Sequence, residues 1–224
     1  MNTELFDFLR ELKDNNNREW FKNNKKRYDR LHAQHIKEVQ ELIEMIALFD
    51  PEIAGLDAKN CIYRIYRDIR FSHDKTPYKT HFGAYMTGHG GRTGFYAGYY
   101  LHLEPDNSFL SGGCWQPPPA LLKKLRQDIY HNMDEFLEIL ENKDFKNTYS
   151  ELEGEQLKRI PEGFSVDSPY ANILKHKDFV VSTSKSDVFF NIHNWKDFVI
   201  EDFKKLYPFN RFLNYTIKEY LETV

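Results

Sequence analysis

Charged and polar side chains are concentrated in one short segment of the chain, Arg64 to His81. Its 18 residues include five cationic side chains, two carboxylates, two histidines and three hydroxyls of Ser or Thr. Arginine forks suit bidentate contact with phosphate or carboxylate groups, and lysines add point charge beside them. The segment therefore predicts a binding site for a small anionic ligand. The residues expected to contact it are Arg64, Tyr66, Arg70, Lys75, Lys79, Tyr100 and His102.

Alternation with a period of two predicts that this segment begins inside a strand, Cys61 to Phe71. The expected core face is Cys61, Tyr63, Ile65, Arg67, Ile69 and Phe71, and the expected polar face is Ile62, Arg64, Tyr66, Asp68 and Arg70. The arginines and lysines would supply charge, Tyr66 and Tyr100 would orient the ligand, and Asp68 would hold the arginines. Arg67, on the core face, is expected to pair with a buried carboxylate or to cap helix carbonyls.

Three other interpretations of the segment stay open. It can be an internal salt-bridge network, with Asp68 neutralising Arg64 or Arg70, and Asp74 pairing with a lysine, Lys75 or Lys79; we weigh this equally with ligand binding. It can belong to an enzyme in which Asp68, His73 or His81 does acid–base chemistry on the ligand. It can also be a protein or nucleic-acid interaction surface, although the net charge of −3 gives no basic excess for nucleic acid.

Histidines near the predicted sheet raise the question of a metal. His102 shares a strand face with Tyr100 and Glu104, and Asp68, His73 or His81 would complete a histidine–carboxylate set with it. No histidine pair has the spacing of four residues that a zinc-binding helix uses. Histidines hydrogen-bonded in polar loops are the favoured interpretation, so we predict no metal site and no cofactor.

Helices are predicted at the N-terminal end, over residues 1–58. Thr3 can cap a first helix whose apolar residues recur at helical spacing, Leu5, Phe6, Leu9 and Leu12. The run Asn15 to Asn17 breaks it, and a second, long helix is expected from Arg18 to Phe49. Asp50 and Pro51 end that helix, because a residue before proline is driven out of the helical region.

A sheet-rich region is predicted over residues 59–116. After the strand at Cys61, further strands are expected at 82–87, 95–104 and 109–115, with a turn or loop at Gly88 to Gly94 and turn residues from Pro105 to Ser108. Short loops between consecutive strands favour an antiparallel meander.

The remaining region, residues 117–224, is predicted to be helical with one further strand. Helices are expected after Pro117 to Pro119 and at 133–141, 169–174, 195–206 and 208–222, the strand at 178–184, and irregular chain over most of 145–177. The fold class is α+β, a single domain over 1–224 with a mostly antiparallel sheet of about 4–6 strands packed by N- and C-terminal helices.

Composition agrees with a folded protein of the cytoplasm. Hydrophobic residues make up 41% of the chain and aromatic residues 16%, which a disordered chain would lack. Only two cysteines are present, the N-terminal residues carry charges without an apolar core of a signal peptide, and no apolar run reaches membrane-spanning length. We therefore expect no membrane partner; a small anionic ligand is the one partner suggested, and the oligomeric state is open.

Long stretches of the sequence resemble a known family. They are YRIYRDIRFSHDKTPYKTHFGAYM, GYYLHLEPDNSFLSGGCWQPPP, LRELKDNNNREWFKNNKKRYDRL, LKRIPEGFSVDSPYANILKHKDFVVS and YPFNRFLNY. Together they cover most of the chain, which resembles the family called domain of unknown function 2461. The resemblance implies a single-domain cytosolic protein with no established activity, and it implies no catalytic residues.

Overall fold

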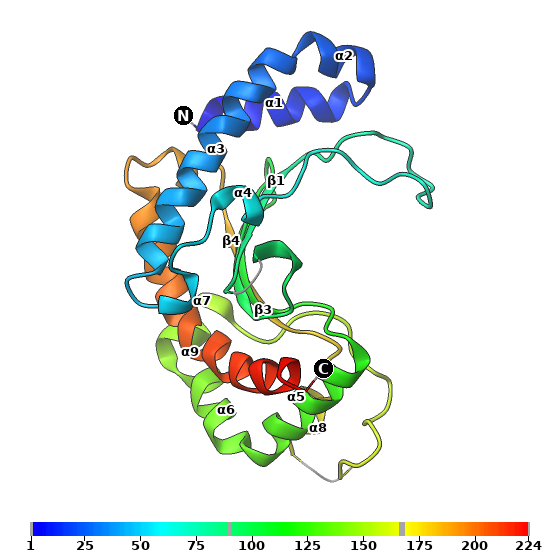
Figure 1. Ribbon diagram of the computed structural model, residues 1–224, viewed down its shortest axis with the longest axis vertical. Helices are drawn as coiled ribbons and strands as arrows, with labels where there is room; N and C mark the ends of the chain where they lie inside the picture. The colour runs from blue at the N-terminus through cyan, green and yellow to red at the C-terminus, as the bar shows by residue number, and fades with distance from the viewer. Residues whose placement is uncertain (1, 89–90, 166–168, 224) are drawn as a thin grey trace. The chain divides into compact units, whose positions relative to one another are not determined.

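The computed structural model describes residues 2–88, 91–165 and 169–223. It is a mixed α/β fold with one antiparallel sheet of four strands in the order β1-β2-β3-β4 (Figure 1). The strands are β1 (Phe82–Met86), β2 (Gly98–Leu103), β3 (Ser108–Cys114) and β4 (Phe179–Lys185). Each strand pairs with the next one along the chain, which confirms the predicted meander.

Helices occupy both ends of the described chain. They are α1 (Asn2–Asp14), α2 (Arg18–Asn23), α3 (Lys25–Ile46), α4 (Ala58–Cys61), α5 (Pro119–His131), α6 (Met133–Glu141), α7 (Lys143–Tyr149), α8 (Ala171–Leu174) and α9 (Trp195–Leu221), with 3-10 turns η1 (Pro51–Ile53), η2 (Gly91–Thr93) and η3 (Phe189–Asn191). Among the described residues, no helix combines the length and the apolar character needed to cross a bilayer.

The chain forms two compact units. The first is Met1–Arg92, Tyr100–Leu110 and Ser184–Glu201, and the second is Thr93–Tyr99, Ser111–Thr183 and Asp202–Val224. Strands β2, β3 and β4 and helix α9 contribute residues to both. The single domain over 1–224 therefore stays a prediction.

In the first unit, the first predicted helix is confirmed and the second predicted helix is wrong. The apolar residues of α1 are buried as predicted, although α1 begins at Asn2 and places Thr3 within its first turn rather than at its cap. The predicted continuous helix from Arg18 to Phe49 is wrong, because the chain breaks at Asn24 between α2 and α3. The backbone and side-chain N–H groups of Asn24 both donate to Trp20 O at 3.0 Å, and such local bonding by Asn competes with a continuing helix.

The predicted strand from Cys61 to Phe71 is also wrong. Cys61 ends α4, and the chain from Ile62 to β1 forms only isolated bridges, Ile62 with Ala84 and Tyr66 with Tyr78. Figure 1 shows this segment as a long hairpin between α4 and β1. A lone ribbon of two chains is only marginally stable without further strands or a second layer. The alternation still sorts the side chains over part of the segment, since Cys61 and Ile65 are buried while Arg64 and Asp68 are exposed. Phe71, expected in the core, is 94% exposed.

Helices α7 and α9 show two further differences from prediction. The chain forms α7 at the start of the segment expected to be irregular, with Asn142 accepting from the N–H groups of Asp144 and Phe145 as its cap. The two closing helices are instead one helix, α9, which contains Pro208. Proline inside a helix costs about 3 kcal/mol. Apolar residues buried on both sides of Pro208 offset this cost: Phe203, Leu206, Phe209 and Leu213.

Candidate functional site

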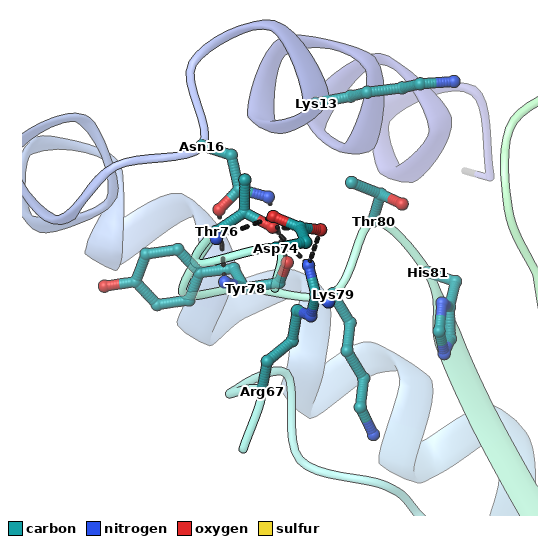
Figure 2. A pocket seen from close by; sticks show the side chains of 9 residues that line it. All are labelled: Lys13, Asn16, Arg67, Asp74, Thr76, Tyr78, Lys79, Thr80 and His81. Carbon is teal, nitrogen blue, oxygen red and sulfur yellow. Dashed lines mark hydrogen bonds and ion pairs between the residues drawn. The ribbon is translucent and has the colours of Figure 1, made fainter. Parts of the chain in front are cut away.

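A cavity of about 450 Å³ opens in the first unit, beside the C-terminal end of α1 and the chain that leads into β1 (Figure 2). Its size falls in the range typical of sites for small molecules. The lining residues are Lys13, Asn16, Arg67, Asp74, Thr76, Tyr78, Lys79, Thr80 and His81. We call this cavity the pocket.

Asn16 and Tyr78 fix one wall of the pocket. The Asn16 side chain accepts from the Tyr78 N–H at 3.1 Å and donates to the Tyr78 carbonyl at 2.9 Å. The Tyr78 ring stacks on Phe21 of α2 with centroids 4.0 Å apart. The asparagine run that ends α1 therefore also positions the chain that carries Lys79, a role that the sequence alone did not reveal.

Arg67 and Asp74 neutralise each other at the wall of the pocket. The Arg67 guanidinium forms an ion pair with Asp74 and donates to the Thr76 hydroxyl (Figure 2). The hydrogen bond from Arg67, followed by those from Thr76, lowers the pKa of Asp74 to about 2. Arg67 thus pairs with a partly exposed carboxylate rather than the buried one expected, and Asp74 pairs with neither Lys75 nor Lys79.

Lys79 is a half-buried cation that lines the pocket. Burial lowers the pKa of its ammonium, and the positive charges of Arg64 and Arg92 lower it further. Among the described residues no carboxylate forms an ion pair with it, and its ammonium lies 5.1 Å from the centre of the Tyr63 ring. Figure 2 shows the side chain extending away from the Arg67–Asp74 pair. Lys79 is therefore a cation held among like charges.

The other predicted charges do not line the pocket. Arg70 forms a bidentate pair with Asp68, with donor–acceptor distances of 2.9 and 2.6 Å, which lowers the pKa of Asp68 to about 2. The salt-bridge interpretation is confirmed for this pair. Lys75 donates to the Ile69 carbonyl at 2.9 Å. Arg64 and His73 are exposed and also lie outside the pocket lining.

The predicted tyrosines and His102 also lie outside the pocket lining. Tyr66 is 46% exposed and packs against Phe21 and Tyr78. Tyr100 contacts His102, with its hydroxyl 2.9 Å from His102 Nδ1. Of the site residues predicted from the sequence, two therefore line the pocket: Lys79 and His81.

Next to the pocket, His81, His102 and Glu104 form a compact cluster whose nitrogen and oxygen atoms lie within 4.8 Å of one another. We call it the histidine cluster. His102 Nε2 lies 3.3 Å from Glu104 Oε2. The His102 ring is held between His81 and Phe109, with centroid distances of 4.4 and 4.5 Å. His81 also lines the pocket, so the two features share one residue.

Burial lowers the pKa of both histidines of this cluster. It lowers the pKa of His81 to about 4, helped by the neighbouring His102 and opposed by Glu104. It also lowers the pKa of His102, against the pull of Glu104. For Glu104 itself, burial acts to raise the pKa, but hydrogen bonds from Asn107, Thr80 and His102 outweigh it and lower the pKa overall.

The strands explain why these residues meet. Tyr100, His102 and Glu104 are two residues apart along β2 and its end, so they point to one face, as the alternation predicts. His81 directly precedes β1, which pairs with β2. Gly83 of β1 lets the end of the Tyr100 side chain approach, since a Cβ at this position would lie 2.8 Å from the Tyr100 hydroxyl. The sequence already indicated that Glu104 shares a strand face with His102. The proximity of Glu104 to His81, in contrast, depends on the pairing of β1 with β2.

The fold and this polar site define a mixed α/β protein with a cationic pocket beside a histidine cluster. A family model described as conserved hypothetical protein (DUF2461) matches residues 4–212, and the chain belongs to this family. The predicted family is thereby confirmed. No curated protein and no solved structure matches the chain.

Proposed function

We propose that the pocket binds a small ligand that carries a phosphate or carboxylate group. The observation that carries the proposal is Lys79, a half-buried ammonium whose charged neighbours Arg64 and Arg92 are also cations. An anion placed near it would relieve this repulsion and replace lost hydration, so binding would be favoured. Arg64 contributes through its charge although it does not line the pocket.

The rest of the lining suits an anion as well. Lys13 adds an exposed ammonium at the end of α1, whereas the hydroxyls of Thr76 and Thr80 already donate to Asp74 and Glu104. The one carboxylate in the lining, Asp74, is paired with Arg67 and so opposes an anion less than a free carboxylate would. Arg70 and Lys75 take no part, because their polar groups are bonded to Asp68 and to the Ile69 carbonyl.

An enzyme acting on the same ligand is the second candidate. Of the acid–base residues considered, His81 lines the pocket, while Asp68 and His73 do not. With a pKa of about 4, His81 is neutral at pH 7, the state a general base requires, but a pKa so far below the operating pH makes it a weak base. We also place the protein in the cytoplasm, in keeping with its two unpaired cysteines.

The test of the binding proposal uses Lys79→Met. Removing the charge should weaken binding of inorganic phosphate, pyrophosphate or citrate at least tenfold, since a hydrogen bond to a charged group contributes about 1.5–3 kcal/mol. The same change should raise the melting temperature of the ligand-free protein, because it removes a half-buried ammonium from among like charges. Isothermal titration and thermal unfolding measure the two effects.

Two matched variants control this experiment. Lys79→Arg keeps the charge and should retain most of the affinity. Lys75→Met removes an exposed lysine of the same hairpin and should bind as the wild type does. Equal affinity of the Lys79→Met and wild-type proteins for every anion that binds would contradict the proposal.

A further inference from the structure

We infer that His81, His102 and Glu104 form a binding site for a divalent transition-metal ion, of the class that Zn²⁺ represents. Two imidazoles and one carboxylate are the ligands such ions prefer, in contrast to the all-oxygen sites of Mg²⁺ and Ca²⁺. Three protein ligands leave a coordination position for water or a substrate. The inference goes beyond anion binding, because His81 alone among the three lines the pocket.

The spacing of the ligand atoms supports this assignment. Zinc bonds of about 2.0–2.2 Å in a tetrahedral arrangement place neighbouring ligand atoms about 3.3–3.6 Å apart. His102 Nε2 and Glu104 Oε2 are already 3.3 Å apart. The three ligand atoms all lie within 4.8 Å of one another, close to this spacing.

The surroundings of the ligands resemble the outer shell of a metal site. Metal-bound histidines use their second ring nitrogen in a hydrogen bond that fixes the ring, and ligating carboxylates are hydrogen-bonded in turn. Here the Tyr100 hydroxyl lies 2.9 Å from His102 Nδ1. Glu104 accepts hydrogen bonds from Thr80 at 2.9 Å and from Asn107 at 2.7 Å. The ligands are therefore positioned by neighbours before any ion arrives.

The same arrangement of atoms is also compatible with a cluster that holds no metal. In that case His102 donates a hydrogen bond from Nε2 to Glu104 and accepts one at Nδ1 from the Tyr100 hydroxyl. With an ion at Nε2, the proton moves to Nδ1 and the Tyr100 oxygen becomes its acceptor. Tyr100 is thus a positioning residue whose hydroxyl supports metal binding from outside the first ligand set. An ion here would also add positive charge beside the pocket.

The experiment is a metal titration of the full chain after removal of bound metal with EDTA, in buffer free of phosphate and citrate. We expect isothermal titration to show one Zn²⁺ ion bound per chain. One Co²⁺ ion should also bind per chain, and its visible absorption band should be the one typical of Co²⁺ with a reduced coordination number. His102→Ala should lower the affinity more than 100-fold, and Tyr100→Phe, which removes a single oxygen, by about 10–100-fold. His73→Ala, at an exposed histidine of the hairpin, should change nothing.

Thermal unfolding with and without Zn²⁺ gives a second readout, because an ion bound to the folded state alone raises its stability. If His102→Ala fails to fold, Tyr100→Phe still decides the matter. Zn²⁺ affinity equal in the wild-type, His102→Ala and Tyr100→Phe proteins, or no binding by the wild type, would overturn the inference. Neither result would touch anion binding, which is measured through Lys79 without metal.

Discussion

Replacing Gly113 with alanine should abolish folding or lower the free energy of unfolding by at least about 4 kcal/mol. Gly113 lies in β3 with φ +105, a conformation that residues with a side chain rarely adopt. A Cβ there would lie 2.0 Å from the Phe179 carbonyl oxygen of β4 and 2.9 Å from the Phe209 ring. The first of these neighbours is backbone in a paired strand, so it cannot move aside. Urea unfolding followed by circular dichroism measures the loss.

Gly163 is the matched control for this change. Its φ is +94, yet the space around it is open, with nothing within 4 Å of an added Cβ. Gly163→Ala should therefore cost only the backbone strain of about 1–2 kcal/mol. The difference between the two variants isolates the steric clash at Gly113. Similar losses in both would show that β3 and β4 do not approach as closely as the structure has them.

Acidification from pH 7 to pH 4.5 should remove about 2–3 kcal/mol of stability through His35 alone. This histidine of α3 is buried, and burial, followed by the nearby His32, lowers its pKa from 6.5 to about 3. In the unfolded chain it takes up a proton near pH 6.5, whereas in the folded protein it stays neutral. The unfolded state thus binds more protons, so this stability is present above pH 6.5 and is lost as the pH falls towards 3.

His35→Leu tests the effect. The variant should lose less stability between the two pH values than the wild type does, with the remaining loss coming in part from His81, whose pKa is lowered to about 4. His131→Gln, at an exposed histidine of α5, should keep the wild-type slope. Urea unfolding at pH 7 and pH 4.5 gives the comparison. An unchanged slope in His35→Leu would count against a buried, neutral His35.

The sheet was predictable because its signals are local. Alternation along Tyr99, Leu101 and Leu103 marks the buried face of β2, and turn residues between β2 and β3 mark the hairpin. Alternation from Cys61 to Phe71 separated buried from exposed side chains over part of its length but wrongly predicted a strand, because a period of two does not show whether a partner strand pairs along the segment. Burial of Phe71 would need other parts of the fold to cover it, and in the structure Phe71 is exposed.

The candidate site was predictable in part for a related reason. Sequence identifies the acids and bases of the hairpin but not which pairs form. Asp68 pairs with Arg70 and Asp74 with Arg67, which leaves Lys79 as a cation without a carboxylate partner among the described residues. These outcomes depend on side-chain geometry in an irregular hairpin. The proximity of His81 to Glu104 needed the pairing of β1 with β2, which no local pattern fixes.

The central claim is that Lys79 meets an anion in the pocket, and lysine acetylation read by mass spectrometry tests it most directly. The protein is treated briefly with acetic anhydride at rising concentrations of inorganic phosphate, with chloride held at matched ionic strength in the control. We predict that phosphate slows acetylation of Lys79 in a saturable manner and leaves Lys75 unchanged. Acetylation of Lys79 at the same rate with and without phosphate would contradict the account.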